Sequence, residues 1–361
     1  MASNRVLLAP RSIFSGLSTA LPPLVDEKAL AGYLDEHLPG DGELDVRRHQ
    51  AGHSNETFFI RRGTTEHVLR RPPLGVFLPT AHDVGREFRV LSALSDSPVR
   101  VPRTSLHCED ESVIGAPFYL MEKIDGVVIR ADLPDAFSSE EDRGAIGDEL
   151  VDALVELHSV DAAAFGLDDF GRPSGYLERQ LKRWTGQMEL TLPLTRPLPD
   201  LEEIGRWLSS QLPDSSPATI VHGDYKLDNV VFSKEAPPRL LAILDWEMST
   251  LGDPLADLGW MTSFWSEAND EEVGVLAEQN RVTTLPGFRS RRDLVDRYAS
   301  KTGRDVDNLD WYQVLAIWKL AILLEGSYAR HLAGMTDDPF FAEMEHGVPS
   351  LAKRALEVAG L

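Results

Sequence analysis

The chain has 361 residues, 42% of them hydrophobic and 26% charged, which is typical of a globular protein long enough for two lobes with substantial cores. Its 36 basic and 58 acidic residues give a net charge of −22, which argues against a nucleic-acid partner because backbone phosphates would be repelled. The single cysteine, Cys108, excludes an intrachain disulfide, fits a reducing cytoplasm and is expected to be a small core residue.

Residues 1–24 are interrupted by Pro10 and polar neighbours, so we expect a flexible arm and not a signal peptide. Helical spacing follows over 26–38, with Asp26 as a possible N-cap. The pattern then changes to short strands at 44–50, 57–62 and 66–71, followed by a helix over 83–94 and a strand over 117–122.

The remainder of the chain is mostly helical in pattern. Helices are predicted over 140–158, 176–188, 201–212 and 309–330, and strands over 218–223, 230–232 and 240–244. The last helix contains an aromatic stripe that is typical of a core. Its most apolar stretch is broken by Lys319 and is far too short to span a bilayer, so no membrane segment is predicted.

The most informative motif is His222-Gly223-Asp224-Tyr225-Lys226-Leu227-Asp228-Asn229, followed by Ile243-Leu244-Asp245-Trp246-Glu247. Phosphoryl transfer from ATP requires positioning of an acceptor hydroxyl and neutralisation of phosphate charge by Mg²⁺. In the kinase template an Asp accepts the hydroxyl proton, an Asn holds one metal ion and a later Asp holds the other. Asp224, Asn229 and Asp245 have that order, and each Asp follows a predicted strand. A hairpin around 234–238 would join the last two strands.

An isolated His-x-Asp is common by chance, but the complete pattern is specific. With the Gly175–Gln180 segment and Asp245–Pro254, it resembles the aminoglycoside phosphotransferase family, in the branch related to kinase-like domains fused to acyl-CoA dehydrogenases. The resemblance covers about residues 25 to 350. It implies an α+β, bilobal protein-kinase-like fold, with an antiparallel sheet and helices in the N-lobe (25–122) and a mostly helical C-lobe (123–361).

For the N-lobe, the resemblance implies nucleotide-binding residues. The kinase Gly-rich motif is absent, and a shorter loop with Ser54 and Asn55 is expected at the phosphates. Arg70 stands where kinases have the phosphate-binding lysine, and Glu87 is its expected partner, although Arg86 or Arg89 could instead pair with Glu87. The hinge is predicted to bind adenine through the Glu122 carbonyl and the Ile124 amide.

For the C-lobe, the expected catalytic residues are Asp224 and, near the transferred phosphate, Lys226. Asn229 and Asp245 are the expected Mg²⁺ ligands. His222 and Asp257 are expected to orient the catalytic loop by hydrogen bonding.

The predicted function is therefore transfer of the γ-phosphoryl group of MgATP to the hydroxyl of a small molecule, with the oligomeric state left open. The acceptor is either an aminoglycoside, which an acidic surface could attract, or a hydroxyacyl-CoA or other hydroxylated metabolite. A nucleotide-binding pseudokinase that acts as an interaction module is the alternative of another class.

Overall fold

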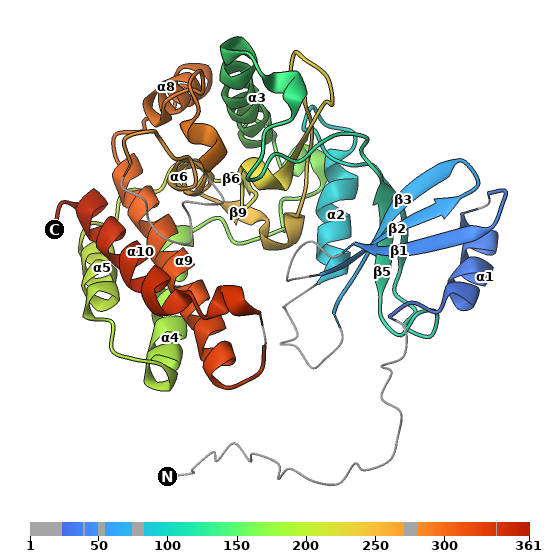
Figure 1. Ribbon diagram of the computed structural model, residues 1–361, viewed down its shortest axis with the longest axis horizontal. Coiled ribbons are helices and arrows are strands. Elements are labelled where there is room, and N and C mark those ends of the chain that lie inside the picture. Colours follow the sequence, from blue (N-terminus) through green and yellow to red (C-terminus); the bar gives the residue numbers. More distant parts are fainter. Residues whose placement is uncertain (1–23, 39, 50–54, 74–82, 271–280, 337) are drawn as a thin grey trace, which may run out of the picture.

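The computed structural model describes residues 24–38, 40–49, 55–73, 83–270, 281–336 and 338–361 (Figure 1). The predicted N-terminal arm therefore lies outside the described residues, apart from Leu24. The described chain forms two lobes, a smaller one built on a sheet and a larger one built mostly of helices (Figure 1).

The smaller lobe contains an antiparallel sheet with the strand order β1-β2-β3-β5-β4. Its strands are β1 (Leu44–His49), β2 (Glu56–Arg62), β3 (Thr65–Arg71), β4 (Thr104–Cys108) and β5 (Phe118–Glu122). The sequence predicted all of them except β4, an edge strand whose register against β5 shifts after Thr104. The predicted antiparallel N-lobe sheet is confirmed.

Alternating side chains place one helix on each face of this sheet. Leu69 and Phe118 belong to the core cluster that includes α1 (Glu27–His37), whereas their neighbour Val68 belongs to the cluster that includes α2 (Val84–Leu94). Successive strand residues point to opposite faces, so a single strand serves both cores. Helix α2 thereby lies between the sheet and the larger lobe (Figure 1).

The start of α1 follows the prediction from sequence. The Asp26 side chain caps it by accepting hydrogen bonds from the amides of Lys28 and Ala29, each at 3.0 Å. Cys108 is buried in the core cluster against α1, as expected of a small core residue.

The larger lobe has two short strand pairs that carry the loops of the sequence motif. Strand β6 (Thr219–Val221) pairs with β9 (Thr250–Gly252), and β7 (Val230–Phe232) pairs with β8 (Leu240–Ile243). The β7–β8 pair confirms the predicted hairpin, whereas β9 was not predicted. The helices of this lobe are α3 (Glu140–His158), α4 (Tyr176–Thr191), α5 (Pro199–Ser210), α6 (Leu255–Ser263), α8 (Arg291–Thr302), α9 (Leu309–Leu332) and α10 (Met344–Ala359).

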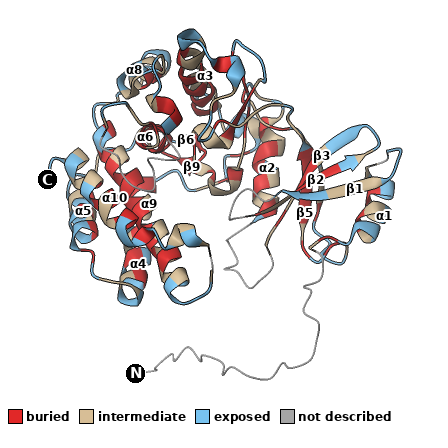
Figure 2. Ribbon diagram, viewed as in Figure 1, coloured by how far each residue is buried: buried red, intermediate tan, exposed pale blue. Residues whose placement is uncertain are grey.

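Helix α9 is the centre of the larger lobe and packs against α4, α5, α6 and α10. Figure 2 shows it as one of the most buried helices. Trp311, Tyr312 and Trp318 are each at most 3% exposed, so the predicted aromatic stripe is part of the core. Among the described residues, no helix has the length and apolar content needed to cross a membrane.

Candidate active site

The predicted catalytic loop, residues 222–229, follows β6 through a turn that requires glycine. Gly223 has φ = +84°, and a Cβ at this position would lie 2.7 Å from the Met248 carbonyl oxygen. Both the positive φ and the close backbone contact favour the residue without a side chain. Gly223 thus allows the chain to turn between the end of β6 at Val221 and Asp224.

Two donors hold the Asp224 carboxylate. The Asn229 Nδ2 atom donates to Asp224 Oδ2 at 2.7 Å and to its backbone carbonyl at 2.9 Å, while the Trp260 indole N–H donates to Oδ1 at 2.7 Å. Burial raises the pKa of Asp224, and the positive charges of Lys226 and Lys319 oppose that shift. The carboxylate is therefore fixed in orientation and more basic than an ordinary aspartate.

The β7–β8 hairpin brings the second acid to the same place. Val230 pairs with Ile243, and the Leu244 amide donates to the Asn229 carbonyl at 2.8 Å, so the two loops lie side by side. Asp245 follows with φ = 65°, the only positive φ of a non-glycine residue in the described chain. A left-handed conformation at such a residue carries strain, which is typical of functional sites.

Arg70 of β3 lies between two carboxylates from the two lobes. Its Nη2 atom is 3.3 Å from Glu87 Oε1 on α2 and 3.1 Å from Asp245 Oδ1. Burial alone would lower the pKa of Arg70, but Glu87 and Asp245 raise it, so the guanidinium stays charged. The predicted Arg70–Glu87 pair is present, and the alternative partners Arg86 and Arg89 bond elsewhere, to Phe170 and Ser249 carbonyls and to Asp169 and Gly166.

Two polar atoms near this pair are buried without a hydrogen-bond partner among the described residues, namely Arg70 Nε and Asn55 Oδ1. Asn55 Nδ2 donates weakly to Glu87 Oε2, at 3.4 Å. A buried donor and acceptor left without partners usually indicate a missing ligand or water. Ser54, the other expected phosphate-loop residue, lies outside the described residues.

Asp257 at the start of α6 holds the catalytic loop from behind. Its fully buried carboxylate accepts hydrogen bonds from the backbone amides of His222, at 2.6 Å, and Gly223, at 2.8 Å. His158 Nε2 lies 3.2 Å from the same carboxylate. The expected bracing contacts of Asp257 are therefore present, and His158 at the end of α3 joins them.

The His222 side chain connects the two loops. Its Nε2–H donates to the Leu244 carbonyl at 2.8 Å, and its Nδ1 accepts from the Asp224 amide at 3.2 Å. A carbonyl can only accept and an amide can only donate, so these two bonds fix the neutral tautomer. His222 thus bonds to the backbone of Asp224 and of Leu244, the residue before Asp245, and its loop-orienting role remains a prediction.

Lys226 extends toward acids of its own loop. Its Nζ atom is 3.3 Å from Asp228 Oδ2 and 3.9 Å from Asp224 Oδ1, and it lies 5.1 Å from the centre of the Phe264 ring. Burial acts to lower the pKa of Lys226, but the carboxylates of Asp224 and Asp228 raise it overall. A protonated lysine beside Asp224 can neutralise negative charge that arrives on a substrate.

The predicted hinge runs directly from the sheet into the larger lobe. Glu122 ends β5, pairs with His67 of β3, and its amide donates to the Arg103 carbonyl at 2.7 Å. Ile124 follows it, and Val127 then bonds to Phe232 of β7 in both directions, at 2.8 and 2.9 Å. This connection makes residues 122–127 a link between the sheet and the catalytic hairpin.

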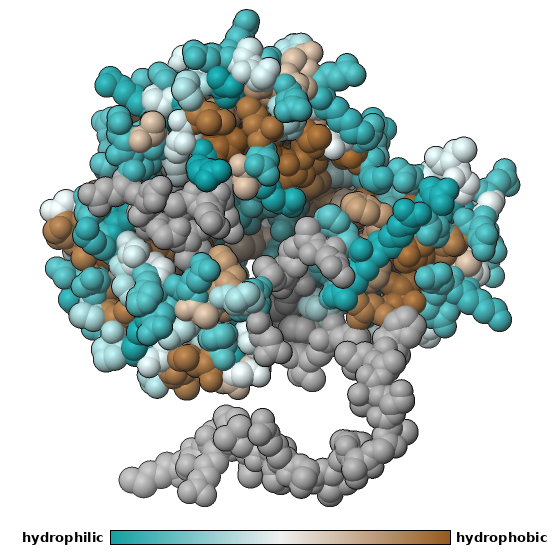
Figure 3. Space-filling model, viewed as in Figure 1, coloured by the Kyte–Doolittle hydropathy of each residue, from teal (hydrophilic) through white to brown (hydrophobic). Residues whose placement is uncertain are grey.

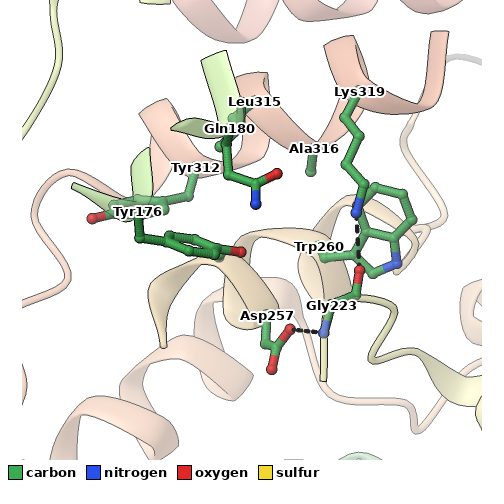
Figure 4. Close-up of a pocket in the computed structure, with 10 residues that line it drawn as sticks. Tyr176, Gln180, Gly223, Asp257, Trp260, Tyr312, Leu315, Ala316 and Lys319 are labelled. Carbon is green, nitrogen blue, oxygen red and sulfur yellow. Dashed lines mark hydrogen bonds between the residues drawn. The ribbon is translucent and has the colours of Figure 1, made fainter. Parts of the chain in front are cut away.

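The sequence did not predict two residues that touch the catalytic loop, Trp260 of α6 and Lys319 of α9. Lys319 Nζ donates to the Gly223 carbonyl at 3.0 Å and lies 4.2 Å from the centre of the Trp260 ring. Both line a small pocket between α4, α6 and α9, together with Tyr176, Gln180 and Tyr312 (Figure 4). The available signal was Lys319 itself, a charge in the most apolar stretch of the chain.

The donor set fits a Mg²⁺–nucleotide complex. Among the described residues, no three His, Cys, Asp or Glu side chains form a metal cluster, and Mg²⁺ characteristically takes one or two protein ligands plus phosphates and water. Because Asn229 Nδ2 is bound to Asp224, its Oδ1 remains for a cation, and Asp245 follows the strand that pairs with the one after Asn229. The unpaired Arg70 Nε adds a buried donor for a phosphate oxygen.

Comparisons with known proteins agree with this geometry. Acyl-CoA dehydrogenase family member 11 of Rattus norvegicus is 36% identical over 345 residues, covering 92% of this chain but 43% of that protein, so the chain spans less than half of this relative. The crystal structure of a putative aminoglycoside phosphotransferase from Ralstonia eutropha superposes with a TM-score of 0.77 at 32% identity, covering 93% of this chain and 98% of that one.

Choline kinase from Cryptosporidium parvum has the same fold, with a TM-score of 0.61 at 12% identity over 93% of this chain and 97% of its own. These matches confirm the bilobal protein-kinase-like fold that the sequence predicted. The family model described as "Phosphotransferase enzyme family" matches residues 45–294, which include the catalytic loop, Asp245 and the Arg70–Glu87 pair. The chain belongs to the phosphotransferase enzyme family.

Proposed function

We propose that this protein transfers the γ-phosphoryl group of MgATP to a hydroxyl group of a small molecule. The observation that carries the proposal is the convergence of three strand ends: Asp224 follows β6 and is bound by Asn229, the residue before β7, and Asp245 follows β8, the strand paired with β7. Arg70 reaches Asp245 from the other lobe. Membership of the phosphotransferase family supports the reaction class.

The phosphates of ATP would be held by residues of both lobes. Asn229 and Asp245 would bind Mg²⁺, which supplies neutralisation of phosphate charge when bound. Arg70 presents a buried guanidinium with an unused Nε donor, and its planar fork suits a phosphate oxygen pair. The Glu122 carbonyl and the Ile124 amide would bind the adenine edge. Asn55 has an unpaired Oδ1 and, with Ser54, would border the phosphates.

Asp224 would act on the acceptor. Its pKa is raised by burial, which makes the carboxylate a better proton acceptor near neutral pH. The indole of Trp260 and the amide of Asn229 each occupy one carboxylate oxygen, which leaves the remaining lone pairs to orient and deprotonate the attacking hydroxyl. Lys226 would balance the charge of the transferred phosphoryl group.

Two acceptor classes follow from the relatives. The Ralstonia eutropha structure suggests an aminoglycoside, and the acyl-CoA dehydrogenase relatives suggest a hydroxyacyl-CoA or a related hydroxylated metabolite. A cytoplasmic location fits both. The intact set of Asp224, Asn229 and Asp245 argues for catalysis and against a pseudokinase that only binds nucleotide.

A panel assay tests the proposal. ADP release from MgATP is measured with aminoglycosides, hydroxyacyl-CoAs, choline-like alcohols and sugars, and at least one acceptor is expected to stimulate it. Asp224→Ala is expected to lower turnover by about 10²- to 10⁴-fold with little change in ATP affinity. Asp228→Asn, in the same loop and keeping an oxygen for Lys226, is the matched control. ATP binding with no stimulation by any acceptor would support the pseudokinase instead, and wild-type turnover in Asp224→Ala would reject the assigned base.

A further inference from the structure

Lys319 is a buried charge in the middle of an apolar helix. It lies on α9 one residue after the fully buried Trp318, and it is only 9% exposed. Burying an ammonium group is costly unless specific partners compensate for the lost water. The contacts of Lys319 therefore indicate what compensates for the burial of its ammonium group.

The hydrogen-bond acceptor of Lys319 and its nearer aromatic ring both belong to the proposed phosphotransfer site, while the Trp184 ring of α4 lies farther from the ammonium, at 5.8 Å. Its Nζ atom donates to the carbonyl of Gly223, the residue immediately before Asp224. The same ammonium lies 4.2 Å from the centre of the Trp260 ring, and the indole N–H of Trp260 donates to Asp224 Oδ1 at 2.7 Å. Figure 4 shows the lysine side chain reaching down from α9 to the Gly223 carbonyl, alongside the indole.

Two routes thus connect one lysine to one carboxylate. The first acts on the backbone at Gly223, whose amide on the opposite side is fixed by Asp257. The second acts through Trp260, whose ring is held against the cation and whose N–H is held against the carboxylate. Contacts with both the backbone and the side chain of the loop over-determine where Asp224 lies.

We propose that Lys319 is a positioning residue of the phosphotransfer site, and that its ammonium group fixes Asp224 through the Gly223 carbonyl and the Trp260 indole. This inference rests on the proposed function for its catalytic consequence. The contact between lysine and indole is a property of the fold that can be measured without turnover.

The charge on Lys319 is expected to change in an accessible pH range. Burial lowers its pKa to about 8, while Asp224 and Asp257 act to raise it. The positive charges of Arg183 on α4 and of Lys226 act to lower the pKa of Lys319 further. The ammonium form is therefore present at neutral pH and is lost as the pH rises through about 8, together with the cation–π contact to the indole.

The first test measures activity with water as the acceptor, so that no substrate needs to be known. ADP release from MgATP is followed between pH 6.5 and 9.5 for wild type, Lys319→Met and Lys319→Gln, with the exposed Lys353→Met on α10 as the control. Lys319→Met is expected to be about 10- to 100-fold slower at pH 7 and to lack the alkaline decline of wild type. Lys319→Gln keeps a donor for Gly223 without the charge, so it is expected to recover part of the rate while also lacking the decline.

The second test separates positioning from folding. Because burial disfavours the charged lysine, Lys319→Met at pH 7 is expected to melt no lower than wild type. The indole N–H resonance of Trp260, assigned by its loss in Trp260→Phe, is expected to shift with pH in wild type with a midpoint near 8, and to stay constant over that range in Lys319→Met.

The outcomes are distinct. Equal rates and equal pH profiles in wild type and Lys319→Met overturn the proposal. A Trp260 indole resonance with the same pH dependence in wild type and Lys319→Met also overturns it. If the melting temperature of Lys319→Met falls enough to account for the lost rate, Lys319 acts in folding, and this outcome also overturns the proposal. If wild type releases no ADP with water or with any acceptor of the panel, the proposed function fails, and the pH dependence of the Trp260 resonance still decides whether Lys319 positions the loop.

Discussion

Asp257→Ala should destabilise the whole larger lobe because it removes a buried acceptor from the catalytic loop. In the wild type the carboxylate accepts from the amides of His222 and Gly223 at 2.6 and 2.8 Å. An unpaired buried N–H costs about 1–3 kcal/mol, so the two amides together cost about 2–6 kcal/mol. That is a large share of the roughly 5–15 kcal/mol that stabilises a folded domain.

Urea denaturation at pH 7 measures this loss directly. The matched control is Asp296→Ala on α8, whose side chain is 69% exposed and pairs with the exposed Arg292 at 3.6 Å, so a change within about 0.5 kcal/mol is expected. If Asp257→Ala costs less than about 1 kcal/mol, the two amide bonds do not brace the loop and the reasoning is refuted.

Three further changes test separate parts of the site. Asp245→Ala should abolish Mg²⁺-dependent ATP binding measured by calorimetry, and retained binding would place the metal elsewhere. Arg70→Met leaves Glu87 buried without its cation, so thermal and urea unfolding should show a loss of about 3–5 kcal/mol, and a loss below 1 kcal/mol would contradict the buried pair. The hydrogen bonds to Asp257 outweigh its burial and hold its pKa below the ordinary value. The stability that ionised Asp257 contributes is thus present above about pH 3.9 and is lost as the pH falls through its folded pKa. The difference in unfolding free energy between wild type and Asp257→Asn should therefore shrink on acidification. A difference that does not depend on pH would argue against an ionised Asp257.

Local patterns predicted the elements that have regular alternation. Strands β2, β3 and β5 are rich in apolar and β-branched residues, and the Asp26 cap marks the start of α1, so each was predicted near its true place. Strand β4 was missed because Ser105 and His107 weaken its pattern at a sheet edge and its register is irregular. Strand β9 has only three residues and is defined by its partner β6, which lies about thirty residues earlier in the chain.

The same distinction applies to the site. The spacing of Asp224, Asn229 and Asp245 reflects a loop and a hairpin that are local in sequence, so it could be interpreted without a structure. The contact between Trp260 and Asp224 joins residues 36 positions apart through the placement of α6, and the contact between Lys319 and Gly223 joins residues 96 positions apart. Such pairs depend on how the helices pack, which periodicity does not encode.

Helix α8 shows a signal that was present but not used. Ser290 and Asp293 form a capping box at its start, and Gly303 ends it with a positive φ. Its apolar stripe consists of little more than Leu294 and Tyr298, so charge dominated its pattern. The end signals were more informative here than the hydrophobic spacing.

The most direct test of phosphotransfer is ³¹P NMR of the protein with MgATP and the acceptor panel. The γ-phosphate resonance should decrease while a phosphomonoester resonance grows, and neither change should occur at a comparable rate with Asp224→Ala. A spectrum that shows no new phosphomonoester with any acceptor, or one that grows equally fast with Asp224→Ala, would contradict the account.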